Sequence, residues 1–104
     1  MVKNLAQLKR KLAKGAVFVI VEHCRPEAVG QKRKVNYADT TGIYTIHPDT
    51  PHSVSPAANG AKGIHLPWKK ASSWEFREDG VCAQYAGNGE KTAKTLNIAF
   101  RILE

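Results

Sequence analysis

The sequence predicts an α+β fold: one N-terminal helix packed on a strongly bent antiparallel sheet, or on a small SH3-like, partly open barrel, of five to seven strands. Three observations predict this fold. Residues 4–14 have a helical apolar period, the short apolar segments that follow have a period of two, and turn signals separate those segments. Consecutive short strands joined by tight turns usually pair antiparallel and curl. We find no internal repeat and no linker, so residues 1–104 are expected to form a single domain.

The helix is expected over residues 4–14. Asn4 is a suitable N-cap with Gln7 three positions later, as in a capping box, and Gly15 stands where a C-terminal glycine is common. The apolar positions follow the spacing i, i+3, i+7 and define one stripe that we expect to be buried against strands: Leu5, Leu8 and Leu12.

The β-rich part spans residues 16–103. Its turns are marked by Asp39–Gly42 and by Asp79-Gly80, the latter a strong hairpin signal. The expected strands cover residues 16–23, 31–38, 42–47, 64–68, 74–77, 81–85 and 96–102.

Alternation predicts which side chains of these strands point inwards. In the third strand we expect Tyr44 and Ile46 in the core, and in the last strand Leu96, Ile98, Phe100 and Ile102. Residues 48–63 are rich in Pro, Gly and Ser, which predicts a long, irregular and mobile loop.

The positive charge is concentrated at one end of the chain. Sixteen Lys and Arg against nine Asp and Glu give a net charge of +7. Residues 1–34 hold nine basic and two acidic side chains, whereas residues 35–104 hold seven of each. Such asymmetry favours a polyanionic partner, with nucleic acid first and a membrane surface second. The alternative is a solvated basic face that only aids solubility.

The candidate nucleic-acid-binding residues lie on the polar side of the helix, on the second strand and after the short fourth strand. Trp68 is included because proteins bind single-stranded nucleic acid by stacking bases on aromatic rings while neighbouring lysines contact the phosphates. The alternative for Trp68 is a plug in the barrel mouth, with the neighbouring lysines facing water. The candidates are Lys3, Arg10, Lys11, Lys14, Lys32, Lys34, Trp68, Lys69 and Lys70.

No motif points to catalysis, to a metal or to a cofactor. His47 and His52 are spaced as one ligand pair, but His23 and Cys24 form a poor second pair, since adjacent strand residues point to opposite faces. Nucleophile elbows, P-loops and dinucleotide fingerprints are absent from the sequence. We therefore expect a protein that is not an enzyme, with no catalytic residue, no metal and no cofactor.

Cys24 and Cys82 match no disulfide or metal-binding spacing, so both are expected to be free and reduced. Strand parity and neighbouring residues predict that both are at least partly exposed. The longest apolar run, residues 16–21, is too short to span a bilayer. A cytoplasmic protein without a membrane partner, either a monomer or a weak homodimer, is the resulting expectation.

The order of parts resembles small uncharacterised proteins of about this length encoded by bacteriophages, prophages and other mobile elements. The resemblance rests on the leucine-and-lysine helix ending at Gly15, the run Ile64-His-Leu-Pro-Trp-Lys-Lys-Ala71, Trp74-Glu-Phe76 and the closing strand at 96–102. This chain departs from those proteins in the order of Pro67 and Trp68 and in the 48–63 loop. The resemblance implies a mobile-element origin and carries no activity and no catalytic residue.

Two functions follow as hypotheses. The first is a non-enzymatic accessory domain that contacts nucleic acid through the basic residues named above. The alternative is a protein–protein interaction or inhibitor module that uses sheet edges and the 48–63 loop.

Overall fold

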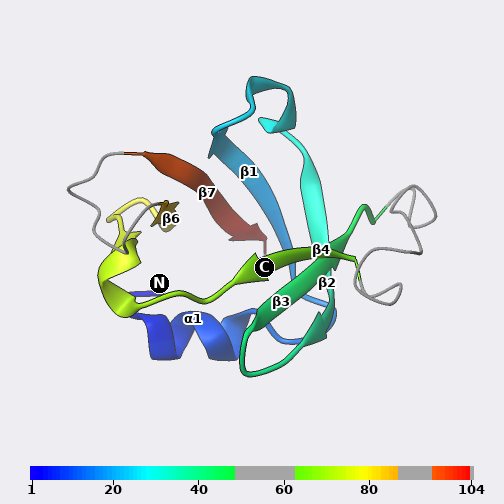
Figure 1. Ribbon diagram of the computed structural model, residues 1–104, viewed down its shortest axis with the longest axis horizontal. Helices are drawn as coiled ribbons and strands as arrows, with labels where there is room; N and C mark the ends of the chain where they lie inside the picture. The colour runs from blue at the N-terminus through cyan, green and yellow to red at the C-terminus, as the bar shows by residue number, and fades with distance from the viewer. Residues whose placement is uncertain (49–62, 87–94, 104) are drawn as a thin grey trace.

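The computed structural model describes residues 1–48, 63–86 and 95–103, and these residues form one helix and one antiparallel sheet of seven strands (Figure 1). The predicted α+β class is confirmed. The strands are paired in the order β4-β3-β2-β1-β7-β6-β5. The elements are α1 (Leu5–Lys11), β1 (Val17–His23), β2 (Lys32–Ala38), β3 (Gly42–Ile46), β4 (Ile64–Pro67), β5 (Trp74–Phe76), β6 (Val81–Tyr85) and β7 (Leu96–Leu103). Two short 3-10 helices, η1 (Pro26–Ala28) and η4 (Ala71–Ser73), follow β1 and precede β5.

The helix begins as predicted and ends earlier than predicted. The Asn4 side chain accepts a hydrogen bond of 2.8 Å from the backbone N–H of Gln7. The Gln7 side chain in turn accepts one of 2.8 Å from the N–H of Lys3, so the N-terminal turn is capped from both sides. Leu12 has left the helical region, at φ −94° and ψ 44°, and α1 ends before it. Gly15, at φ 98°, then turns the chain into β1.

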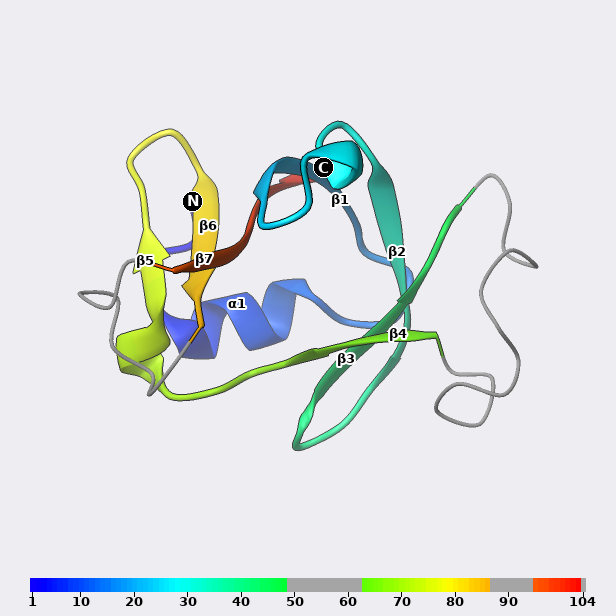
Figure 2. The same cartoon turned by 45° about the horizontal axis from the view of Figure 1, so that its top comes forward.

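The sheet is strongly curled but not closed into a barrel, so the SH3-like barrel stays a prediction. β4 and β5 are its unpaired edges. Side chains nevertheless connect the end of β4 to the other end of the sheet. The Gln84 amide donates a 2.6 Å hydrogen bond to the Pro67 carbonyl, and the Trp74 indole donates to the Trp68 carbonyl. Figure 2 shows the resulting shape, with β5 and β6 on one side of α1 and β2, β3 and β4 on the other.

The main core fills the concave side of the curled sheet. Leu8 and Leu12 of α1 are completely buried there, and Leu5 is half-buried against the same core. The predicted leucine stripe is therefore confirmed for two residues and met in part by the third. Phe18 of β1 and Phe100 of β7 belong to the same core, and their tilted rings have centroids 4.4 Å apart. Burial of this apolar surface is the main stabilising contribution to the fold.

The orientation predicted for the side chains of β3 is wrong. In β3 the core residues are Ile43 and Thr45, whereas Tyr44 and Ile46 are only half-buried. Tyr44 instead packs on His65, with ring centroids 4.5 Å apart. Large aromatic side chains do not need the core when a neighbouring strand supplies a ring to stack on.

Cys82 is the second wrong orientation, because it lies in the main core and is 1% exposed. This error arises because β6 buries side chains on both faces. Ala99 of β7 points away from the main core, as alternation with Ile98 and Phe100 predicts, and it is nevertheless fully buried. On the convex face Val81, Ala83 and Ala99 form a second small cluster.

The predicted loop at 48–63 falls almost entirely outside the described residues, and its expected mobility stays a prediction.

Leu8→Ala is expected to lower the free energy of unfolding by about 2–5 kcal/mol, because it removes a fully buried side chain and leaves a cavity beneath α1. Urea denaturation followed by tryptophan fluorescence measures the change. Ala6→Ser, at an exposed position of the same helix, is the matched control and should leave the midpoint nearly unchanged. Equal midpoints for the wild type and Leu8→Ala would contradict the packing of α1 on the sheet.

Candidate functional site

The predicted basic residues are all exposed, and they occupy three segments of the fold. Four lie in or beside α1, two lie on the convex face of β2, and two follow β4. The list is Lys3, Arg10, Lys11, Lys14, Lys32, Lys34, Lys69 and Lys70. Their ammonium and guanidinium groups are therefore accessible to a partner.

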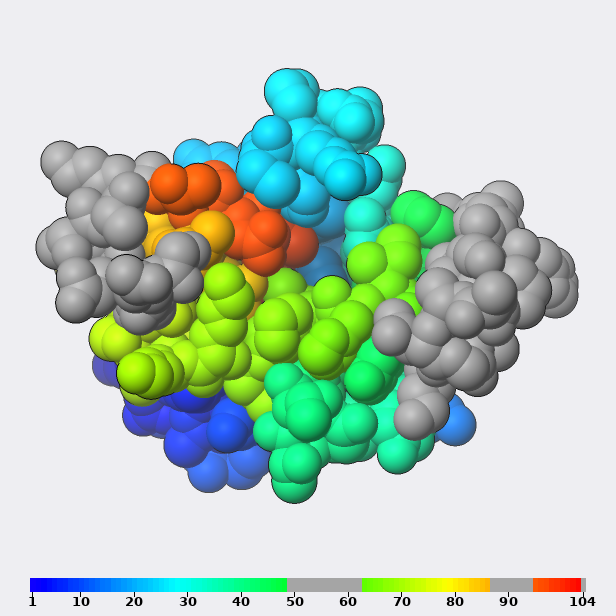
Figure 3. Space-filling model, in the orientation of Figure 1, coloured from blue at the N-terminus to red at the C-terminus, as the bar shows by residue number. Residues whose placement is uncertain are grey.

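Lys9 connects α1 to the segment after β4. Its ammonium lies 5.7 Å from the centroid of the Trp68 ring, a cation–π contact. The contact places the helix against residues 68–70, and Figure 3 shows the blue helix beside the yellow-green segment. Lys69 adopts φ 54°, in the left-handed region that costs a non-glycine residue about 1–2 kcal/mol. Lys9 was not among the candidates, because it flanks the leucine stripe instead of lying opposite to it.

Backbone hydrogen bonds connect the other end of the helix to β2. The Gly15 N–H donates to the Val35 carbonyl, and the Val35 N–H donates to the Ala16 carbonyl, both at 2.8 Å. Lys14 and Lys34 each precede one of the paired residues, so their backbones lie close together beside the start of β1. We call the set Lys9, Arg10, Lys14, Lys34, Lys69 and Lys70 the basic surface.

Trp68 does not offer a face for stacking, which corrects its assignment as a nucleic-acid-binding residue. Its side chain is 6% exposed, and its indole N–H donates a 3.1 Å hydrogen bond to the Asp39 carbonyl. The Lys9 ammonium lies over the ring. Trp68 therefore serves as the plug at one end of the curled sheet, the alternative that the sequence left open.

Glu75 and Asp79 of the C-terminal hairpin, and Glu22 of β1, are paired with arginines. Arg77 contacts Glu75 at 2.7 Å and Glu22 at 3.3 Å, and Arg101 lies 3.8 Å from Asp79. Hydrogen bonds from Arg77 to Glu75 and then to Tyr85 raise the pKa of the Arg77 guanidinium. In contrast, the members of the basic surface form no ion pair with any residue in the described part of the chain. The cations of the basic surface are thus not paired with described carboxylates, whereas arginines and carboxylates are paired around β5 to β7.

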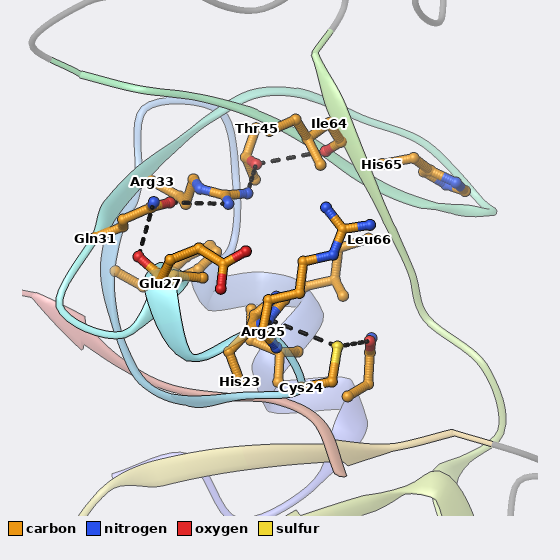
Figure 4. A pocket seen from close by; sticks show the side chains of 14 residues that line it. His23, Cys24, Arg25, Glu27, Gln31, Arg33, Thr45, Ile64, His65 and Leu66 are labelled. Atoms are coloured by element: carbon orange, nitrogen blue, oxygen red, sulfur yellow. Dashed lines mark hydrogen bonds between the residues drawn. The ribbon is translucent and has the colours of Figure 1, made fainter. Parts of the chain in front are cut away.

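A pocket of about 500 Å³ opens into the concave side of the sheet at a place that sequence reasoning missed. Figure 3 shows the surface hollowed between the cyan segment that carries η1 and the green β4. Figure 4 looks into it, with α1 behind the lining residues. His23 lies at the end of β1, the connection between β1 and β2 supplies Cys24, Arg25 and Glu27, and β2 supplies Arg33. We call this the cationic pocket.

Arg33 reaches the pocket because alternation along β2 turns it to the concave side, opposite to Lys32 and Lys34. It donates to the Gln31 side chain at 3.1 Å and to the Thr45 hydroxyl at 3.5 Å. Its Nε is buried without a hydrogen-bond partner in the described structure. Burial lowers the pKa of the guanidinium from its usual high value, although an arginine stays charged at neutral pH.

His23 and Cys24 meet in this pocket, although adjacent strand residues were expected to point apart. The strand ends at His23, and the chain turns so that the Cys24 Sγ lies 3.6 Å from His23 Nδ1. His23 Nδ1 also accepts a 2.9 Å hydrogen bond from the Arg25 N–H. Burial, then the charges of Arg33 and Arg25, lower the pKa of His23, while Glu27 opposes them. The imidazole is therefore neutral at pH 7.

Asn97 of β7 is the second side chain in contact with the Cys24 thiol. Its side-chain oxygen lies 3.9 Å from the Cys24 Sγ, and its amide donates to the fully buried Gln84 side chain at 2.7 Å. Within the described ranges the structure contains no group of three or more side chains arranged to hold a metal ion. His52, half of the spaced histidine pair, lies outside those ranges.

Comparisons with family models, with curated proteins and with solved structures find no significant match to this chain. None of the helices in the described residues is long and apolar enough to cross a membrane.

The two thiols are expected to react at very different rates. Cys24 is exposed, whereas Cys82 is buried, and burial raises the pKa of the Cys82 thiol to about 11. Because the thiolate is the reactive form, a disulfide reagent at pH 8 should modify one thiol per native chain and two in denaturant.

The control is Cys24→Ser, which should leave no reactive thiol in the native protein. Rapid modification of the native Cys24→Ser variant would show that Cys82 is accessible and would contradict its place in the core.

Proposed function

We propose that the protein is a non-enzymatic accessory domain that contacts nucleic acid through the basic surface. One observation carries the proposal: lysines from three separate segments adjoin α1, and no described carboxylate pairs with them. Clustered unpaired cations attract phosphates, and counterion release then supplies affinity without reading sequence. The expected mobile-element origin is compatible with such an accessory role and is part of this proposal.

Burial of Trp68 narrows the mode of contact. Because the indole is buried, the basic surface offers ammonium and guanidinium groups, and Trp68 adds no exposed aromatic face to them. Phosphate contacts then dominate over base stacking, so duplex and single strands should bind in proportion to their charge density.

Fluorescence anisotropy with a labelled duplex tests the proposal, and the affinity should fall steeply as salt rises. The variant Lys69→Gly removes one cation from the basic surface and also relieves the left-handed backbone at that position. Weaker binding by this variant therefore cannot come from unfolding. Each lost phosphate contact should reduce the slope of log affinity against log salt by roughly 0.9.

Arg101→Gln is the charge-matched control, because it also removes one cation. Its ion pair with Asp79 is exposed, so its loss should barely affect stability. Equal weakening by Lys69→Gly and Arg101→Gln would mean that only net charge matters and would overturn the basic surface. A pull-down from bacterial lysate treated with nuclease tests the alternative, because a partner retained after digestion would favour a protein-interaction module.

A further inference from the structure

The cationic pocket contains a guanidinium whose charge is not balanced by the protein. Arg33 is half-buried, and its two hydrogen-bond partners, Gln31 and Thr45, are neutral. No carboxylate in the described part of the chain lies within ion-pair distance of it. Removing a charge from water without a counterion is costly. An anion bound in the pocket would supply the missing counter-charge.

A second arginine approaches the same space from a different element. Figure 4 shows Arg25, from the connection between β1 and β2, and Arg33, from β2, both directed into the pocket. The effect of both charges on His23 indicates a positive potential at the pocket wall. Two guanidinium groups that converge on one space suit a carboxylate or phosphate, whose oxygens accept paired hydrogen bonds.

Glu27 is the one acidic side chain among the lining residues. Its carboxylate forms no ion pair with Arg25 or Arg33 in the described structure, so it does not neutralise either arginine by contact. Its negative charge lowers the positive potential of the pocket without direct contact. Removing that charge should therefore strengthen the binding of an anion, whereas removing an arginine should weaken it.

Below the charged rim the pocket wall is apolar. Phe18, Leu66 and Ile98 line it, and all three belong to the main core. A volume of about 500 Å³ lies within the range of roughly 300–1,000 Å³ that small-molecule sites occupy.

We propose that the cationic pocket binds a small organic acid. Its oxyanion head, a carboxylate or a phosphate, lies between Arg25 and Arg33, and its apolar body contacts the wall formed by Phe18, Leu66 and Ile98. No α1 residue lines the pocket, so this ligand and a nucleic acid on the basic surface bind at different places. Failure of one proposal leaves the other intact.

NMR titration of the isotope-labelled protein tests the pocket, with benzoate and phenyl phosphate as probes and benzyl alcohol as their uncharged analogue. Both acids should shift the amide signals of Cys24, Arg25 and Arg33, and benzyl alcohol should not. The acid that binds more tightly identifies the preferred head group. Arg33→Gln should weaken its binding roughly tenfold or more, because hydrogen bonds to a charged group are lost.

Lys32→Gln is the matched control, since it removes the same charge from the neighbouring residue on the opposite face of β2. Its affinity should equal that of the wild type, whereas Glu27→Gln should bind the acid more tightly. Arg25→Gln, at an exposed position, repeats the test if Arg33→Gln fails to fold. The proposal is overturned if neither acid shifts the pocket signals or if Lys32→Gln weakens binding as much as Arg33→Gln.

Discussion

The curl of the sheet depends on two side chains that hold its ends together without strand pairing. The Gln84 amide and the Trp74 indole donate to the consecutive carbonyls of Pro67 and Trp68, at the end of β4. Both donors are buried, so each contact also satisfies a polar group that would otherwise be costly in the interior. Edges joined in this way leave the sheet open yet enclose its concave side. The main core, the seat of α1 and the cationic pocket all lie within that enclosure.

The two ends of the enclosed space carry different side chains because different segments cover them. At one end Leu8 and Leu12 fill the interior, and the cations of α1 are left facing solvent. At the other end α1 does not reach, and the connection between β1 and β2, which includes η1, folds over the opening with charged side chains. The buried Gln84 connects these regions, since it contacts the end of β4 on one side and Asn97, beside Cys24, on the other. The same amide that holds the sheet curled therefore also orients a residue of the pocket.

The fold could be predicted from the sequence because its local signals are strong and agree with one another. Asn4, Gly15 and Asp79-Gly80 mark the ends of elements, and the structure has a cap, a turn and a hairpin at those positions. Orientation failed where alternation is ambiguous. β6 is buried on both faces, so its side chains carry no parity signal, and Cys82 was misplaced. In β3 Tyr44 packs on the His65 ring of the neighbouring strand and not in the core. A contact with another strand cannot be predicted from the sequence of β3 alone.

The basic residues could be identified from the sequence because charged side chains are usually exposed in any fold. Their arrangement in space could not be predicted, because it depends on tertiary structure. Lys9 and Trp68 meet across 59 positions, and the pocket assembles Arg25 from the connection after β1, Arg33 from β2 and Asn97 from β7. Arg33 is the middle of three consecutive basic residues, and alternation along the strand expected at 31–38 places it on the face opposite to Lys32 and Lys34. The pocket that it enters could not be predicted, because other lining residues come from distant parts of the chain. The pleat of β2 sends its two neighbours to the convex face and Arg33 inwards, where it lies between neutral acceptors. Strand geometry alone therefore turns Lys32 and Lys34 towards solvent and Arg33, which lies between them, towards the pocket.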